Sequence, residues 1–309
     1  MYKALITDPV DKECVNRLRS AGIEVTEAYD FTRDLLLENI PKYDILIVRS
    51  RTKVDKQVIE KAERLKVIGR VGVGLDNIDV NEAAKKGIKV LSTPEASTIA
   101  VAELVFALLL SLARSIPKAD NSMKQGRWIK GELHGFELRG KTLGIVGFGR
   151  IGRAVAKRAK AFEMHVVAYD PFAPQAAFDE LGVVRYQNLK EMLAFSDIVS
   201  IHVPLTRETE YMFNEDVIFS MKRGSILINT SRGKVVDTKA LLKALKSGHL
   251  AAAALDVYEN EPPREPWEHE LISLPNVVCT PHIGAQTVEA QRIGAILIAE
   301  NIIKTLTSS

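Results

Sequence analysis

The chain has 309 residues, a length typical of two domains of about 150 residues each. Hydrophobic residues make up 46% and charged residues 26% of the sequence, which is typical of a globular protein and excludes a disordered, collagen-like or membrane-bundle chain. Lys and Arg number 42 against 39 Asp and Glu, so the net charge is +3. This weak excess is compatible with a small anionic ligand and does not indicate nucleic-acid binding.

The sequence carries no pattern typical of secretion or membrane insertion. Its two cysteines, Cys14 and Cys279, are far apart and form no disulfide framework or metal-type spacing. Asp8 interrupts the N-terminal segment before the apolar core of a signal peptide is reached. The most apolar stretch, residues 100–113, is shorter than the roughly 20 residues that cross a bilayer. We therefore predict a cytoplasmic protein with neither a membrane nor a nucleic-acid partner.

The first third of the chain alternates short apolar runs with amphipathic segments. We predict strands at 3–7, 44–50, 65–72 and 88–93, separated by helices at 11–20, 55–64 and 81–87. Continuous β-branched runs are typical of buried parallel strands, and their alternation with helices predicts a parallel sheet covered on both faces.

The alternation resumes after a long apolar helix predicted over residues 98–114 and a polar loop over 124–135. Further strands are predicted at 142–149, 165–170, 183–186, 197–204, 225–231, 251–257 and 276–282. A last amphipathic helix over 288–306 has no strand of its own, so we predict that it returns to the first unit. The predicted domains are therefore 1–97 with 286–309, and 98–285.

Gly147, Gly149 and Gly152 form a GxGxxG motif between an apolar strand and a helix. The first glycine permits a tight turn, the second lets the backbone approach a pyrophosphate, and the third lets the helix pack closely on the strand. Asp170 ends the next strand, about 20 residues on, where an acidic side chain binds a ribose 2′-hydroxyl. Because a 2′-phosphate would face this carboxylate, we predict NAD rather than NADP as cofactor.

Three chemically capable side chains follow later strands of the second unit. Arg232 follows residues 225–231, Glu261 lies in an acidic loop, and His282 ends the last apolar run. Ligands of open parallel sheets bind at the carboxyl ends of the strands, so these residues are candidates for binding an anion and moving a proton. Taken singly, each is explained equally well as a solvated or locally hydrogen-bonded loop residue. No HxxxH or CxxC spacing accompanies His202, His282 and Glu261, so we predict no metal.

The sequence resembles the D-isomer-specific 2-hydroxyacid dehydrogenases over essentially its whole length, most of all the members that oxidise phosphoglycerate. The matching stretches are LIVRSRTKV (46–54), GRVGVGLDNID (69–79), the 143–152 fingerprint, HVPLTRET (202–209), INTSRGKVVD (228–237), AALDVYENEPP (253–263) and TPHIGAQT (280–287). With the strand pattern, the resemblance implies an α/β fold of two doubly wound parallel-sheet domains. A Rossmann domain (98–285) would bind NAD, and a flavodoxin-like domain (1–97 and 286–309) would bind the substrate.

The resemblance also implies roles for individual residues. Arg232 would bind the substrate carboxylate, His282 would act as acid and base, and Glu261 would be the partner of His282. Implied cofactor contacts, besides the three glycines and Asp170, are Arg150, Ile151, His202, Pro204, Thr209, Thr230, Ser231, Asp256, Gly284 and Ala285. Implied substrate contacts are Arg49, Ser50, Arg70, Gly72 and Lys130. A homodimer joined through the long apolar helix is implied as well, with Lys130 reaching the site of the partner subunit.

The activity expected from this resemblance is NAD-dependent oxidation of D-3-phosphoglycerate to 3-phosphohydroxypyruvate, a step towards serine. The phosphate requires cations besides Arg232, and Arg49 and Arg70 end neighbouring predicted strands. We interpret Arg51 and Lys53 as an ordinary solvated basic turn. The alternatives are a glyoxylate or hydroxypyruvate reductase of the same family, and a NAD-sensing, corepressor-like binding protein. Since the sequence ends after the returning helix, we expect no serine-binding regulatory domain and no inhibition by L-serine.

Overall fold

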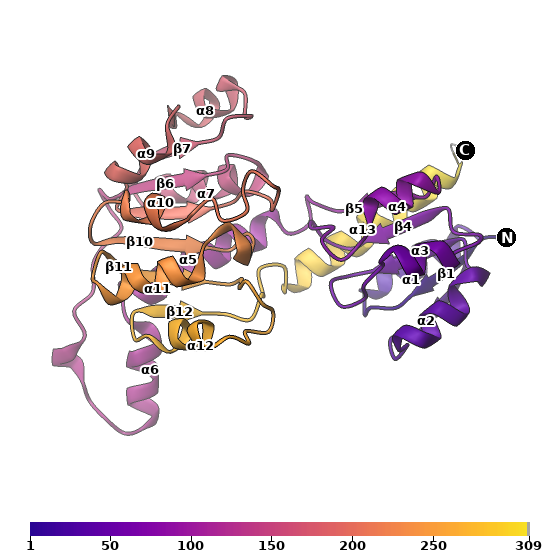
Figure 1. Cartoon of the computed structure of the whole chain (residues 1–309), viewed down its shortest axis with the longest axis horizontal. Coiled ribbons are helices and arrows are strands. Elements are labelled where there is room, and N and C mark those ends of the chain that lie inside the picture. Colours follow the sequence, from indigo (N-terminus) through magenta and orange to yellow (C-terminus); the bar gives the residue numbers. More distant parts are fainter. Residues whose placement is uncertain (308–309) are drawn as a thin grey trace. The chain divides into compact units, whose positions relative to one another are not determined.

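The computed structural model describes residues 1–307 and divides the chain into two compact units. One unit consists of Met1–Thr98 and Ala285–Ser309, and the other of Ile99–Gly284. The boundaries predicted from the sequence differ from these by one residue at each junction. Each unit contains one parallel sheet with helices packed on it, so the predicted α/β fold class is confirmed (Figure 1).

The first unit, which we call the N-terminal unit, has a five-stranded sheet in the order β2-β1-β3-β4-β5, with every pair parallel. This is the strand order of flavodoxin-like folds. Its strands are β1 (Lys3–Ile6), β2 (Glu24–Glu27), β3 (Ile45–Val48), β4 (Val67–Arg70) and β5 (Lys89–Ser92). Its helices are α1 (Lys12–Ser20), α2 (Arg33–Asn39), α3 (Lys56–Lys61), α4 (Val80–Lys85) and α13 (Val288–Thr307), with a 3₁₀ turn at Ile40–Lys42.

Strand β3 shows why this sheet needs helices on both faces. Its four residues are all buried; Leu46 and Val48 enter one hydrophobic core, and Ile45 and Ile47 enter another. Helix α13 covers the second core, packing against α1, β4 and β5 (Figure 1). The last helix therefore returns to the N-terminal unit, which makes that unit discontinuous in sequence.

Strand β2 and helices α2 and α6 are among the elements that the sequence pattern does not predict. Strand β2 lies at the edge of its sheet and has no fully buried residue, so it contains no apolar run. Helix α2 is short and begins where the Thr32 hydroxyl accepts a hydrogen bond from the backbone of Leu35. Helix α6 (Ile116–Lys124) begins after Ser115, whose φ of 49° ends the preceding helix.

The second unit, the nucleotide unit, has a seven-stranded parallel sheet in the order β12-β11-β10-β9-β6-β7-β8. Strands β6 to β11 follow the 3-2-1-4-5-6 order of dinucleotide-binding sheets, and β12 is added beyond β11. The strands are β6 (Thr142–Val146), β7 (His165–Tyr169), β8 (Val184–Tyr186), β9 (Ile198–Ile201), β10 (Ser225–Asn229), β11 (Leu250–Leu255) and β12 (Val277–Cys279). The helices are α5 (Thr98–Ala113), α6, α7 (Arg150–Ala161), α8 (Gln175–Leu181), α9 (Leu189–Phe195), α10 (Glu215–Phe219), α11 (Thr238–Lys246) and α12 (Pro266–Ser273), with 3₁₀ turns at Lys130–Glu132 and Gly233–Val235.

Helix α5 is the long apolar helix predicted from the sequence. Its residues Ala102, Val105 and Leu109 are buried in the core on one face of the seven-stranded sheet. Within residues 1–307 no single helix is long and apolar enough to cross a membrane; only α5 and α6 together, across a 66° bend, reach that length and composition.

Candidate active site

The GxGxxG turn joins β6 to α7 and leaves open space at one glycine. A Cβ atom at Gly147 would lie 2.7 Å from the backbone carbonyl of His202, and one at Gly152 would lie 2.2 Å from the Gly147 oxygen. At Gly149, apart from its two chain neighbours, no atom of residues 1–307 lies within 4 Å of the added atom, and none of their side chains caps the start of α7. The start of α7, where Gly149 and Arg150 are exposed, can therefore receive a phosphate on its backbone N–H groups.

Asp170 follows β7 and is tied into the same turn. Its carboxylate accepts hydrogen bonds from the backbone N–H groups of Phe148 at 2.7 Å, Phe172 at 2.8 Å and Ala173 at 3.0 Å. A carboxylate has about four lone-pair positions, so one remains for a ribose hydroxyl. Thr230, just after β10, has a buried hydroxyl with no hydrogen-bond partner in the described chain. An acceptor at Asp170 and an unsatisfied hydroxyl at Thr230 both fit a polar dinucleotide such as NAD.

His202 follows β9 beside the glycine-rich turn. Its backbone N–H donates to Val146 at 2.7 Å, and its Nε2 atom lies 2.8 Å from the Ser200 hydroxyl. Burial lowers the pKa of His202 to about 3. This imidazole is therefore neutral at physiological pH and is not a proton carrier in that range.

Two hydroxyls implied as cofactor contacts are occupied by their own loops. The Thr209 hydroxyl donates to the Pro204 carbonyl at 2.6 Å and accepts from the Thr206 N–H at 2.8 Å. The Ser231 hydroxyl donates to Asn229 Oδ1 at 2.8 Å. These side chains fix the turns after β9 and β10. Ile151, which is half-buried, packs against the core of the nucleotide unit.

His282 and Glu261 form the closest pair of ionisable side chains at this edge of the sheet. The His282 Nδ1 atom lies 2.6 Å from Glu261 Oε2, and the two side chains are 46% and 39% exposed. The hydrogen bond to Glu261 raises the pKa of His282 and outweighs burial, while the charge of Arg232 opposes the rise. The pair therefore stabilises the imidazolium form.

Asp256 holds the turn that carries His282. It follows β11, is 1% exposed, and accepts from the Thr280 hydroxyl at 2.7 Å and from the N–H groups of Ile283 at 2.8 Å and Gly284 at 2.9 Å. Burial raises the pKa of Asp256, although these hydrogen bonds act in the opposite direction. Asp256 is implied as a cofactor contact by the resemblance; in the structure its carboxylate fixes the backbone of His282, whose φ is 53°.

Arg232 follows β10, the neighbour of β11 in the sheet. Its carbonyl accepts from the Asn229 side-chain amide at 2.9 Å, and its guanidinium donates to the Ser231 carbonyl at 2.7 Å. A Cβ atom at Gly233 would lie 1.9 Å from the carbonyl of Tyr258, so the Arg232 turn packs directly on the loop that carries Glu261. The structure thus brings together all three side chains singled out from the sequence.

Arg49 and Arg70 lie at the carboxyl ends of neighbouring strands of the N-terminal unit. Val48, the last residue of β3, pairs with Arg70, the last residue of β4. The Arg70 guanidinium lies over Gly72, where an added Cβ atom would be 1.4 Å from Nη1. Arg49 and Gly72 both line a small cavity of this unit. Two cationic side chains therefore stand at one edge of this sheet.

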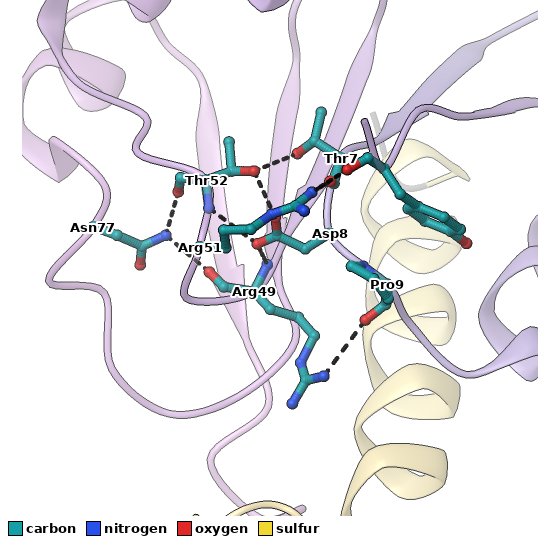
Figure 2. A network of polar contacts seen from close by, with 8 residues as sticks. Thr7, Asp8, Pro9, Arg49, Arg51, Thr52 and Asn77 are labelled. Carbon is teal, nitrogen blue, oxygen red and sulfur yellow. Dashed lines mark hydrogen bonds and ion pairs between the residues drawn. The ribbon is translucent and has the colours of Figure 1, made fainter. Parts of the chain in front are cut away.

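The loop that carries Arg49 is fixed by a buried carboxylate (Figure 2). Asp8, 1% exposed, accepts from the N–H groups of Arg49 at 2.6 Å and Thr52 at 3.2 Å, from the Thr52 hydroxyl at 2.6 Å, and from Arg51 Nε at 3.2 Å. The Asn77 amide donates to the carbonyls of Arg49 at 2.8 Å and Thr52 at 2.7 Å. Both ends of the loop are thereby held.

Arg51 is exposed, as expected of a solvated turn residue, with 58% of its side chain accessible, but the interpretation did not include its bonded partners. Its guanidinium pairs with Asp8 and donates to the carbonyl of Thr7 (Figure 2). It also donates to the carbonyl of Tyr29. A buried carboxylate needs a cationic or hydrogen-bonding partner, which Arg51 supplies. Lys53 and Ser50 are exposed, as is Lys130 on the 3₁₀ turn of the nucleotide unit.

Asp8 and Asn229 were missed from the sequence. Asp8 lies just beyond the end of β1 and Asn229 is the last residue of β10, so the rule that singled out His282 applies equally to them. Their side chains bind backbone groups of the loops after β3 and β10, a role for which the sequence pattern carries no signal. Within residues 1–307 no group of three or more His, Cys, Asp or Glu side chains is arranged to hold a metal ion.

Comparison with known proteins places this chain in a family. Residues 106–284 match the model of the NAD binding domain of D-isomer specific 2-hydroxyacid dehydrogenases. The chain belongs to this family of dehydrogenases. The prediction of NAD as cofactor is confirmed by the same match. The residues around Gly149, Asp170 and Thr230 are those that would hold it.

Its relatives include members with different substrates. The chain is 48% identical to D-3-phosphoglycerate dehydrogenase of Methanocaldococcus jannaschii over 99% of its own length and 58% of that protein. It is 48% identical to hydroxypyruvate reductase of Thermotoga maritima, covering 99% of this chain and 98% of the relative. A glyoxylate reductase structure from Paecilomyes thermophila superposes with a TM-score of 0.89 at 32% identity, covering 99% and 95%. The chain thus spans about half of the length of the phosphoglycerate dehydrogenases that it matches.

Proposed function

We propose that this protein transfers hydride between NAD and a small D-2-hydroxy acid. The observation that carries this proposal is the His282–Glu261 pair at 2.6 Å, with Arg232 on the adjacent turn of the same sheet edge. A proton carrier and an anion binder beside a dinucleotide turn are the two groups that this chemistry requires from the protein.

Each of the three residues has a distinct part in the reaction. When bound, the nicotinamide ring accepts a hydride in oxidation or supplies one in reduction. Arg232 binds the substrate carboxylate through its planar fork and polarises the reacting carbonyl. His282 removes the hydroxyl proton in oxidation and returns it in reduction. Glu261 orients the imidazole through Nδ1 and favours its charged form, so Nε2 is the nitrogen that exchanges the proton.

For the substrate we propose D-3-phosphoglycerate, oxidised to 3-phosphohydroxypyruvate. This substrate carries a phosphate as well as a carboxylate, so it needs cations besides Arg232. The pairing of Val48 with Arg70 supports this choice because it puts Arg49 and Arg70 at adjacent strand ends of the N-terminal unit. The fixed loop around Arg49 presents its guanidinium and the neighbouring Ser50 at that edge.

Hydroxypyruvate reduction is the second candidate. It is favoured by one observation, that the Thermotoga maritima hydroxypyruvate reductase matches this chain over 98% of its own length. Both reactions use Arg232, Glu261 and His282 in the same roles, so only the need for a phosphate-binding group separates them. A NAD-sensing binding protein would bind the cofactor without turning over any hydroxy acid.

We also propose that the active form is a cytoplasmic homodimer joined through α5. Support comes from apolar side chains exposed on α5, α6 and the segment after them, including Ile99, Ile116 and Trp128. Exposed apolar surface of this kind is typical of an interface between subunits. Lys130, two residues after Trp128, would then lie close to the partner subunit. Sedimentation of the wild type and of Trp128→Ser tests this assembly.

The deciding experiment is a substrate panel on the wild-type protein. We expect kcat/KM with NAD to be highest for 3-phosphoglycerate, above the values for glyoxylate, hydroxypyruvate and D-lactate in the appropriate directions. His282→Asn is expected to lower kcat by about 10²–10⁴-fold, the usual scale for a general acid or base. A His282→Asn protein with wild-type kcat contradicts the proposed mechanism, and a wild type that prefers hydroxypyruvate or glyoxylate contradicts the proposed substrate.

A further inference from the structure

The loop over residues 260–265, which carries Glu261, is bound to a single buried carboxylate. Glu268, in the first turn of α12, is 1% exposed. It accepts hydrogen bonds from the backbone N–H groups of Asn260 at 2.9 Å, Arg264 at 2.9 Å and Glu265 at 3.0 Å. Its Oε2 atom also accepts from the Asn260 side-chain amide at 3.1 Å. Donors on both sides of Glu261 thus converge on one side chain.

Capping of α12 accounts for only one of these bonds. Glu268 is the third residue of the helix, and a capping box requires it to accept from the N–H of Glu265 alone. The other three donors belong to Asn260 and Arg264, which have no part in starting the helix. Their convergence fixes the path of the loop on either side of Glu261.

Glu268 is ionised in this environment. Burial acts to raise its pKa, but the hydrogen bonds from Glu265, Arg264 and Asn260 prevail and lower it. A buried carboxylate that accepts several N–H bonds is costly to replace, because those donors lose their acceptor. Glu268 therefore holds the loop as a charged acceptor at neutral pH.

We propose that Glu268 is a positioning residue, which fixes Glu261 against His282 and so sets the proton affinity of the catalytic imidazole. The inference rests on the proposed function only in taking His282 as the acid and base. The proposed contacts run from Glu268 on α12 to the 260–265 loop, and from Glu261 in that loop to His282 on the turn after β12.

An effect of Glu268 on His282 has to pass through Glu261. The charged groups that act on the imidazole are Glu261 and Asp256, which favour its charged form, and Arg232, which opposes it. Glu268 is not among them. Glu259 lines the same small cavity as Glu268, but its carboxylate is bound by the Thr238 N–H at 2.8 Å and the Tyr211 hydroxyl at 3.2 Å.

The test measures the pKa of His282 directly, by NMR titration of its imidazole protons in the full-length protein, assigned by their loss in His282→Asn. The variants are Glu268→Gln, which keeps the side-chain size, and Glu261→Gln, which removes the carboxylate partner itself. The matched control is Glu270→Gln, on the same helix, whose carboxylate pairs with Lys246 at the surface. The double variant Glu261→Gln/Glu268→Gln completes a thermodynamic cycle.

We expect Glu268→Gln to lower the pKa of His282 by about one unit, the scale of one charge-assisted hydrogen bond. Glu270→Gln should leave it unchanged, and the double variant should match Glu261→Gln. An unshifted His282 in folded Glu268→Gln overturns the inference, as does a double variant whose shift is the sum of the two single shifts. If Glu268→Gln does not fold, Asn260→Ala removes one donor and should give a smaller shift in the same direction; an unshifted His282 there also overturns it.

The kinetic readout separates this inference from the proposed function. If both the proposed function and this inference hold, Glu268→Gln lowers the pH at which oxo-acid reduction declines, together with the pKa of His282 measured by NMR. If His282→Asn keeps its kcat while the NMR shift is present, the acid–base role of His282 fails and the positioning role of Glu268 stands. If kcat falls in His282→Asn and the pKa of His282 is unchanged in Glu268→Gln, the acid–base role of His282 stands and the positioning role of Glu268 fails.

Discussion

The Nδ1 atom of His282 lies 2.6 Å from the Oε2 atom of Glu261, and the two residues follow neighbouring strands, β12 and β11. The pairing is made by loop backbone: Asp256 fixes the turn of His282, and Tyr258 donates its N–H to Glu261 Oε1 at 3.2 Å. The orientation of the imidazole therefore depends on contacts in both loops, the one after β11 and the one after β12.

Glu261→Gln should move the pH dependence of the reaction to lower pH. The hydrogen bond from Glu261 raises the pKa of His282, so its removal lowers that pKa. Oxo-acid reduction needs the protonated imidazole and is lost as pH rises through this pKa, so the loss should begin at lower pH. Oxidation needs the neutral imidazole and should begin at lower pH as well. Profiles of kcat/KM in both directions measure the shift.

The neighbouring histidine provides a control for this assignment. Burial lowers the pKa of His202 to about 3, so it does not titrate in the working range. His202→Gln should therefore leave the apparent pKa of the profile in place, whatever it does to cofactor affinity. If the apparent pKa of the profile shifts in His202→Gln and not in Glu261→Gln, the assignment of His282 as the titrating acid and base is contradicted.

Gly149→Ala should weaken NAD binding without destabilising the fold. Apart from its two chain neighbours, the added methyl group meets no atom of the described residues 1–307 within 4 Å, but it would occupy the space proposed for a pyrophosphate. Losing one N–H bond to a charged phosphate corresponds to a roughly 10–150-fold larger dissociation constant. Gly147→Ala is the contrasting variant, since its methyl group would lie 2.7 Å from the His202 backbone at a φ of 92°. Titration calorimetry and denaturant unfolding distinguish the two, and an unchanged NAD affinity in Gly149→Ala would show that the pyrophosphate lies elsewhere.

Asp170 should make the protein prefer NADH to NADPH. Its carboxylate is held at the end of β7 by three backbone N–H groups, so it cannot turn away from a 2′-phosphate. We expect kcat/KM for NADH to exceed that for NADPH, and Asp170→Ala to narrow the difference. Equal values for the two cofactors in the wild type would remove Asp170 as the source of discrimination.

The sequence predicted well those features that depend on buried strands and fixed turns. The runs at Ile45–Val48 and 226–228 are apolar because both faces of each sheet are covered, and the glycine turn is required by close backbone contacts. Strand β2 could not be found in this way because an edge strand needs no apolar run.

The hydrogen-bond partners of side chains were harder to predict than the loop or strand end on which each residue lies. Arg51 was placed correctly in the loop after β3, but its pairing with Asp8 joins residues 43 positions apart in sequence. The same holds for Asp256, whose predicted cofactor contact is untested and whose bonds to a turn 27 and 28 positions further on were not foreseen. Spacing along the chain carries no information about such contacts, whereas the order of the parallel strands brings them together.

Asp8→Asn should destabilise the N-terminal unit. The new amide turns one acceptor of the buried network into a donor that faces the N–H groups of Arg49 and Thr52. Leaving a buried donor unsatisfied costs about 1–3 kcal/mol. Lys53→Ala, in the same loop and exposed, should change the free energy of unfolding by less than about 0.5 kcal/mol. Denaturant unfolding of both variants is the measurement, and equal stability of Asp8→Asn and wild type would mean that the loop relaxes around the amide.

Arg49→Ala and Arg70→Ala should each weaken the use of 3-phosphoglycerate and spare smaller acids. One charge-assisted hydrogen bond contributes about 1.5–3 kcal/mol, so its loss should lower kcat/KM for 3-phosphoglycerate by roughly 10–150-fold. Glyoxylate has a single carboxylate, which Arg232 alone satisfies, and its kcat/KM should hardly change. Lys53→Ala serves again as the control, because it removes a nearby cation that makes no contact with the Asp8 network. If both arginine variants lose all substrates equally, or if the wild type prefers glyoxylate or hydroxypyruvate, Arg49 and Arg70 are not phosphate ligands and the reductase function replaces phosphoglycerate oxidation.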